Sequence, residues 1–355
     1  TALLVTGFGV RDSVTDIADR QFGEIQIYDI KASLKEKTGI TAEETRSADP
    51  AEELAAQVEK LGGSCTFAYE GTMDLVLDNG IKSVNLVVAQ RPEEIGNYID
   101  IHTDSNQPLE YPKEGEAVIS RKLAESYHLA PGDMITLQDE NQRTIQAVIL
   151  GVCENYIYNY VYLHADTLEE ILGTVDFQNA YINLPADADV HEAGAAFMGM
   201  EAVTAVNVNA DMQVRFSSMM GSMNYIVLVI IGCAACLAFI VLYNLNNINI
   251  TERIREIATI KVLGFYKRET AVYVFRENLV LTAIGCGAGL VLGKLLHMYV
   301  MHEVDIDMIA FDVKITVTGY LLSILLTFLF NWVVNRMMSG KLDRINMAES
   351  LKSVD

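Results

Sequence analysis

The sequence has little positive charge: its 355 residues include 26 Lys and Arg against 47 Asp and Glu. The deficit lies in residues 1–224, which hold 14 basic and 36 acidic residues, a net charge of −22. Residues 225–355 hold 12 basic and 11 acidic residues and are nearly neutral. So acidic a domain repels phosphate, which excludes nucleic acid as a partner. It attracts cationic ligands such as basic peptides, although surface carboxylates also serve simply to keep an exported domain soluble.

Motifs of catalysis and of metal binding are missing as well. The histidines before residue 222 are scattered, and no Cys/His cluster has zinc spacing. Neither a Gly-x-Ser-x-Gly elbow nor a Gly-rich Walker loop is present. We therefore predict no catalytic residue, no metal site and no cofactor bound by this chain. Cys65 and Cys153 fall in the polar part of the sequence, where two cysteines leave open whether they pair.

Long apolar runs are confined to the sequence after residue 222. A membrane-spanning helix needs about 20 predominantly apolar residues, which predicts transmembrane helices over 223–246, 271–301 and 315–338. The second run is interrupted by Lys294, whose side chain can extend toward the headgroups. The same run contains glycines that favour the close approach of another helix, namely Gly285, Gly287, Gly289 and Gly293.

The cations beside these runs predict the orientation, because Lys and Arg concentrate in cytoplasmic loops. Residues 247–270 hold five Lys and Arg, and the C-terminal end holds Arg336, Lys341, Arg344 and Lys352, whereas the short connection 302–314 carries four acidic residues. Residues 247–270 and the tail 339–355 are therefore expected in the cytoplasm. The short connection 302–314 and the large domain 11–222 are expected outside.

The first residues, 1–10, are apolar, lack a starting Met and are too short to cross a bilayer. They have no basic region before them, so they are not a signal peptide. We interpret them as the end of a truncated transmembrane helix.

The large domain alternates strand-like and helix-like segments. Glu24–Ile30 and Ser64–Leu77 read as strands, and Asp49 is placed to cap a helix between them. A β-rich insert is expected over about 112–165, where short alternating runs surround a Pro-Gly-Asp turn, before the α/β pattern returns.

A charged, helix-prone segment lies between the first two apolar runs. Its residues Thr251, Glu252, Arg253, Ile254, Arg255, Glu256 and Ile257 are followed by Lys261 and Gly264, and then by Arg276 and Glu277 at the start of the next run. The Thr-Glu-Arg-x-Arg-Glu-Ile motif, together with Gly264 and Glu277, resembles the cytoplasmic loop of FtsX-like (MacB-type) ABC transporter permeases. The stretch from Leu123 to Leu163 resembles the family more loosely.

The resemblance implies an α/β extracytoplasmic domain, with a porter-like lobe and an inserted β-rich lobe, and an all-α membrane domain. It implies a multi-pass protein of the plasma membrane whose intact unit has four spans. The implied partners are a separate ABC ATPase, which binds the ATP, and membrane lipid. A second permease half is also implied, either in a homodimer or as the N-terminal half of the same polypeptide. The chain itself is then no enzyme, and its role is ATP-driven efflux or mechanotransmission.

By that resemblance the charged segment is the ATPase-coupling site. If it is helical, Ile250, Ile254, Ile257 and Lys261 share one stripe, which suits insertion into a groove on a partner. The alternative is an amphipathic helix that lies on the headgroups. Glu277 is expected either to pair with a cation of the loop or to be a solvated helix start.

An alternative function is of a different class. The acidic domain would then belong to a membrane-anchored receptor that senses cationic peptides and works without an ATPase.

Overall fold

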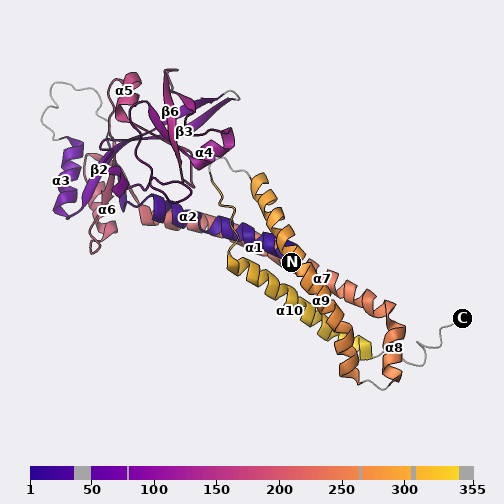
Figure 1. Ribbon diagram of the computed structural model, residues 1–355. Helices are drawn as coiled ribbons and strands as arrows, with labels where there is room; N and C mark the ends of the chain where they lie inside the picture. Colours follow the sequence, from indigo (N-terminus) through magenta and orange to yellow (C-terminus); the bar gives the residue numbers. More distant parts are fainter. Residues whose placement is uncertain (36–48, 78–79, 264–265, 305–308, 344–355) are drawn as a thin grey trace. The chain divides into compact units, whose positions relative to one another are not determined.

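The computed structural model describes residues 1–35, 49–77, 80–263, 266–304 and 309–343. It divides into two compact units (Figure 1). The sheet domain contains Asp16–Met219 and Ile306–Phe311, and the helical unit contains Thr1–Thr15, Met220–Asp305 and Asp312–Asp355. The predicted fold class, an α/β domain with an all-α membrane part, is confirmed.

Within the described residues, nine strands of the sheet domain form one sheet in the order β3-β7-β4-β6-β5-β2-β8-β1-β9. Their bounds are β1 Ile30–Leu34, β2 Ser64–Leu77, β3 Gly80–Ala89, β4 Glu116–Ser120, β5 Met134–Gln138, β6 Thr144–Cys153, β7 Tyr160–Leu163, β8 Asn179–Asn183 and β9 Val203–Val208. The long strand β2 belongs to two parts of this sheet. Its residues 64–68 pair with β8, and its residues 68–77 pair with β3.

The pairing of β2 with β3 closes six of the described strands into a barrel, in the order β3-β7-β4-β6-β5-β2. Alternate residues of each strand point inward, as the period of two in the burial of β6 shows. Leu75, Leu86 and Leu137 are among the fully buried side chains of its interior. Strands β4 to β7 lie within the predicted insert at 112–165, whereas β2 and β3 precede it in the sequence.

The other part of the sheet joins the start of β2 to β8, β1 and β9, all antiparallel. Helices α3 (Pro50–Lys60) and α6 (Val190–Met198) pack on one face of it and bury Leu54 and Phe197. The carboxylate of Asp49 accepts a hydrogen bond from the Ala51 N–H at 3.2 Å, so the expected cap of α3 is present.

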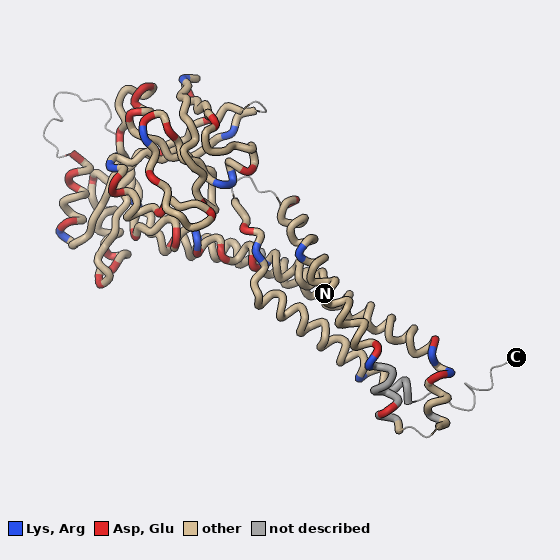
Figure 2. Tube along the Cα trace, in the orientation of Figure 1, with Lys and Arg blue, Asp and Glu red and all other residues tan. Residues whose placement is uncertain are grey.

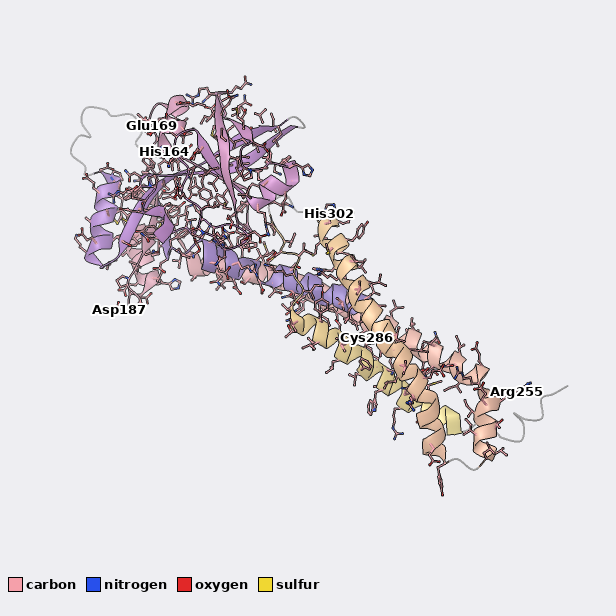
Figure 3. The ribbon with its side chains drawn as sticks, in the orientation of Figure 1. His164, Glu169, Asp187, Arg255, Cys286 and His302 are labelled. Atoms are coloured by element: carbon pink, nitrogen blue, oxygen red, sulfur yellow. The ribbon has the colours of Figure 1, made fainter. Side chains whose placement is uncertain are left out.

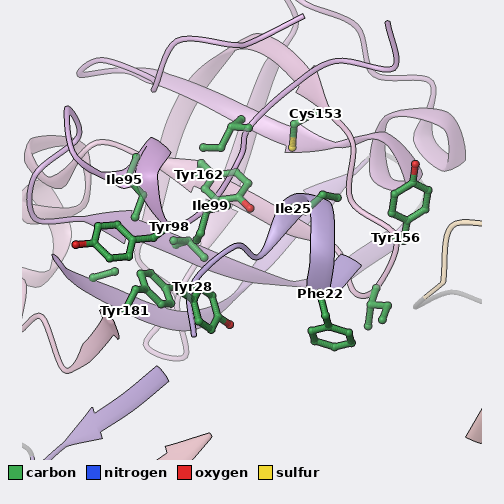
Figure 4. Close-up of a cluster of buried hydrophobic side chains, with 14 of the residues drawn as sticks. Phe22, Ile25, Tyr28, Ile95, Tyr98, Ile99, Cys153, Tyr156, Tyr162 and Tyr181 are labelled. Carbon is green, nitrogen blue, oxygen red and sulfur yellow. The ribbon is translucent and has the colours of Figure 1, made fainter. Parts of the chain in front are cut away.

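A second core lies between the barrel, the neighbouring strands β8, β1 and β9, and the segment that follows α1 into the sheet domain (Figure 4). The entering segment contains α2 (Ile17–Arg20) and a π-helix, η1 (Gln21–Ile25), and a short 3-10 turn, η2 (Ile95–Asn97), adds Ile95. Helices α4 (Arg121–Tyr127) and α5 (Ala165–Leu172) pack against the barrel interior instead. The expected strand Glu24–Ile30 is wrong, because η1 occupies its start and β1 begins only at Ile30.

The helical unit contains α1 (Ala2–Thr15), the greater part of α7 (Asn209–Glu252), α8 (Ile254–Val262), α9 (Lys267–Glu303) and α10 (Val317–Asp343). Among the described residues, three segments are long and apolar enough to cross a membrane: Val227–Glu252, Arg276–Glu303 and Val317–Ser339.

Two glycines of α9 lie where the start of the chain and α1 pack closely against this helix. A Cβ at Gly293 would lie 2.7 Å from the Cβ of Val5, and a Cβ at Gly289 would lie 2.7 Å from the Cβ of Thr1. The expected close approach of another helix is therefore found at these two positions. A Cβ at Gly285 or Gly287 meets no described atom within 4 Å.

The two cysteines of the sheet domain, Cys65 on β2 and Cys153 on β6, are both free. Burial raises the pKa of the Cys153 thiol to about 12 and also raises the pKa of Cys65. Both side chains are therefore protonated thiols at neutral pH, and a thiol is a poor nucleophile for disulfide exchange.

Candidate functional site

The segment between α7 and α9 carries most of the residues that the sequence singles out. Helix α7 ends at Glu252, the chain turns at Arg253, and α8 begins at Ile254. Figure 2 shows charged residues gathered at this end of the helical unit, beyond a long uncharged stretch of the helices. The segment is thus two helices with a break between them, and the break places α8 in a direction of its own (Figure 1).

An ion pair holds this break against the next span. The guanidinium of Arg253 donates two hydrogen bonds to the carboxylate of Glu277, and the distance from Nη2 to Oε1 is 2.8 Å. The side chains remain 37% and 42% exposed, so the pair contributes at most about 1 kcal/mol to stability. Its two-point geometry fixes the start of α8 relative to α9. The expected pairing of Glu277 with a cation of the loop is present.

A group of four amides, of which Asn246 and Asn278 are buried and Asn249 and Asn335 half-buried, lies near the break, and we call it the asparagine network. The Nδ2 of Asn246 donates to the Oδ1 of Asn335 at 3.2 Å, and the Nδ2 of Asn249 donates to the Oδ1 of Asn278 at 2.8 Å. Asn278 in turn donates to the Oδ1 of Asn246. Because these residues come from α7, α9 and α10, the network ties three helices together at the level where α8 departs.

Two residues of the apolar stripe are already buried within the helical unit. Ile250 and Ile257 are 3% and 1% exposed, and they pack in one cluster with Val334 and Met338 of α10. This differs from the expectation that the stripe enters a groove on a partner. The physical reason is that α10, about 80 residues away in sequence, supplies an apolar surface inside the same unit. Ile257 therefore positions α8 on the bundle.

The face that α8 leaves exposed is the charged one. Arg255 and Glu256 of α8 are exposed, as are Thr251 and Glu252 at the end of α7, and Arg255 is labelled on α8 in Figure 3. At the end of the segment Leu263 is 72% exposed. The accessible surface of α8 thus combines charges of both signs with an apolar end, a composition that suits a protein partner.

The remaining residues of the predicted site lie around this surface. Lys261 belongs to α8, and Gly264 lies outside the described residues. Arg276 is exposed and is the first residue of the second candidate span. The asparagine network was not predicted. Its signal in the sequence is a set of amide side chains in otherwise apolar runs, next to the charged segment, where a polar group needs a partner.

A comparison with protein-family models matches residues 228–342 to the FtsX-like permease C-terminal family. These residues are an FtsX-like permease C-terminal domain. The match covers the three candidate spans from residue 228 onward, α8 and the ion pair. Together with the three candidate spans, the match makes these residues the membrane part of a multi-pass protein, as the sequence predicts.

Two solved structures of extracytoplasmic regions are similar to part of the chain. One is the periplasmic region of MacB from Actinobacillus actinomycetemcomitans, at 12% identity over 54% of this chain and 93% of that chain, with a TM-score of 0.35. The other is the extracellular domain of the noncanonic ABC-type transporter YknZ from Gram-positive bacteria, at 14% identity over 51% of this chain and 98% of that chain, with a TM-score of 0.32. No curated protein matches the chain.

Proposed function

We propose that the chain is the permease subunit of an FtsX/MacB-type ABC transporter, and that it transmits the ATP-driven motion of a partner ATPase to an extracytoplasmic domain for export or mechanotransmission. The observation that carries this proposal is the FtsX-like domain over residues 228–342 together with the exposed charged face of α8 inside it. ATP binding and hydrolysis then belong to the partner, and a second permease half completes the assembly.

The distribution of charge supports the orientation. Residues 247–270, which contain α8, hold five Lys and Arg, whereas the connection between α9 and α10 holds three Asp against one Lys. Cytoplasmic loops carry the excess of basic residues, which supports a cytoplasmic α8 and an extracytoplasmic sheet domain. On that side the ATPase meets α8, and the sheet domain is free to act on extracytoplasmic partners.

The geometry of the site supports a role in coupling. Displacement of α8 by a partner acts first on Arg253, which is held to Glu277 of the next span. It acts next on the asparagine network, which joins α7 to α9 and α10. Three spans therefore receive the displacement at one level, as a two-state coupling element requires.

The experiment that tests this function is co-purification of the ATPase with the full chain. Glu252→Ala/Arg255→Ala removes one exposed charge at the end of α7 and one on α8 without touching the buried Ile250 and Ile257, and we expect at least about a tenfold loss of bound ATPase. The matched control is Glu59→Ala/Lys60→Ala, an exposed pair at the end of α3 in the sheet domain, which is expected to leave ATPase binding unchanged.

Two outcomes would contradict the proposal. One is labelling of an Arg255→Cys variant by a membrane-impermeant thiol reagent added to intact cells, because it would place α8 outside. The other is full biological activity without any ATPase, which would favour the receptor of cationic peptides suggested by the acidity of the first 224 residues.

A further inference from the structure

Three stretches of the sheet domain lead directly to or from the helical unit. The first follows α1 and contains η1, the second is the start of α7, and the third is the stretch Ile306–Phe311 between α9 and α10. They are far apart in sequence. In the sheet domain all three contribute side chains to one core, in which Phe22 and Ile25 are buried and Phe216 and Ile309 pack against them.

Gln21, the first residue of the π-helix, is 1% exposed, and every atom of its amide is used. Its Oε1 accepts the backbone N–H groups of Tyr156 and Ile157, at 2.9 and 3.1 Å. Its Nε2 donates to the Oδ1 of Asn155 at 2.9 Å. Asn155 is fully buried and donates to the carbonyls of Ile157 and Tyr158. Gln21 thus holds the loop between β6 and β7 by its backbone.

The opposite side of the same loop is held by the third stretch. The Ala310 N–H donates to the carbonyl of Tyr156 at 2.8 Å, and Ile157 and Ile309 form an antiparallel bridge. Residue 156 therefore gives its N–H to the first stretch and its carbonyl to the third. The loop is the common partner of both.

The second stretch is tied to the first by another buried amide. The Nδ2 of Asn209, the first residue of α7, donates to the carbonyls of Phe22 and Gln26 at 2.8 and 2.6 Å. The last i→i+5 bond of the π-helix runs from the Gln26 N–H to the Gln21 carbonyl at 2.9 Å, and the Ile27 N–H donates to the Tyr98 carbonyl instead, so the end of the helix leaves the Phe22 carbonyl available to the Asn209 amide. We call the bonds made by Gln21, Asn155, Asn209 and Ala310 the amide clasp.

We propose that Gln21 is a positioning residue of this clasp: its amide joins the first stretch to the loop that also holds the third, while Asn209 joins the second stretch to the first, so that the sheet domain takes up the motion of all three together. The idea of motion rests on the proposed function, whereas the existence and the central residue of the clasp do not. A buried donor or acceptor left without a partner is costly, so removal of the Gln21 amide is expected to release the loop from both neighbours.

The test is hydrogen exchange of the full chain in lipid nanodiscs, read by mass spectrometry. Gln21→Met keeps an unbranched side chain of similar length but removes both hydrogen-bonding groups. We expect the amides of Tyr156, Ile157 and Ala310 to exchange at least about tenfold faster, because their opening becomes local and frequent. The rise at Ala310 is decisive, since that residue makes no contact with Gln21 through the bonds described and depends on the loop.

The matched control is Tyr111→Phe. The Tyr111 hydroxyl accepts from the Ala89 N–H at 2.8 Å and donates to the Leu163 carbonyl at 3.0 Å, so the variant also removes buried hydrogen bonds, but in the barrel. It is expected to speed exchange at Ala89 and to leave Ala310 unchanged. Wild-type exchange at Ala310 in Gln21→Met, or an equal rise in both variants, would overturn the proposal.

A crosslink tests whether the clasp stays closed during function. The Cα atoms of an antiparallel bridge lie about 4.5–5.5 Å apart, within the range that a disulfide spans, so Ile157→Cys/Ile309→Cys is expected to oxidise. If the stretches move as one, the oxidised protein keeps the nucleotide-driven output of the complex. Loss of that output on oxidation, with recovery on reduction, would overturn the proposal.

Failure of the proposed function has a different signature. In that case no output of the wild-type complex depends on nucleotide, while the exchange pattern of Gln21→Met and Tyr111→Phe is still the one expected for the clasp.

Discussion

In the sheet domain the barrel buries Leu75 and Leu137 completely, whereas in the helical unit Leu228 is 68% exposed and Asn278 only 4%. The two regions thus place the same kinds of side chain in opposite positions. In water, apolar side chains gain free energy by leaving the solvent. Between helices in hydrocarbon that gain disappears, and association depends on close packing and on hydrogen bonds between polar side chains. The difference teaches that the two regions are built for two solvents.

The largest expected difference between the two regions is the effect of replacing a leucine. We expect Leu137→Ala to destabilise the barrel by about 2–5 kcal/mol, because the substitution leaves a cavity in a closed core. The same change at the exposed Leu228 is expected to stay within about 0.5 kcal/mol. Hydrogen exchange of the most protected amides in each region measures both changes in the free energy of unfolding. Equal effects at the two positions would contradict the assignment of different solvents.

The next effect concerns close packing in the helical unit. Gly293→Leu places a side chain where Val5 and the Ala2 carbonyl lie within 3 Å, and we expect a loss of about 1–3 kcal/mol as α1 is displaced from α9. Gly287→Leu is the control, since no described atom lies within 4 Å of its Cβ position. Thermal unfolding in detergent measures both. A Gly287 variant as unstable as the Gly293 variant would remove the role given to α1.

The smallest effect concerns the polar interior. Asn278→Leu removes the bonds that Asn278 makes with Asn246 and Asn249, and bonds of this kind between membrane helices contribute about 0.6–2 kcal/mol. Asn331 is equally buried, but its Oδ1 has no partner among the described residues. Asn331→Leu is therefore expected to be neutral or stabilising in the same unfolding assay. A reversed order of the two variants would show that burial, and not bonding, decides.

The elements with strong local signals could be predicted from the sequence. Strand β2 has the predicted bounds Ser64–Leu77, and α3 begins after its predicted cap at Asp49. The prediction of a strand over 24–30 is wrong, although Glu24, Ile25, Gln26 and Ile27 alternate between polar and apolar residues. There the tertiary bonds of Asn209 and Gln21 favour the π-helix over the local pattern. The closure of the barrel joins β2 to β5 and β3 to β7 over long sequence distances, which no local pattern reveals.

The candidate site divides in the same way. The charges of α8 and the pairing of Glu277 with a cation of the loop could be predicted from the residue types of the segment and their order. The burial of Ile257 does not, because it depends on Val334 and Met338 of a helix at the other end of the unit. The role of Gln21 was invisible for the same reason, since all its partners in the loop at 155–157 lie more than 130 residues away.

Strand β2 has one last consequence. It lines the barrel with Met73 and Leu75 and supplies Thr66 and Ala68 to the neighbouring sheet. A slip of its pairing by one residue would turn both interiors inside out at once. The pairing register of β2 therefore determines the core of both the barrel and the neighbouring sheet. We expect these two parts to unfold cooperatively, in one transition, whichever of them is destabilised first.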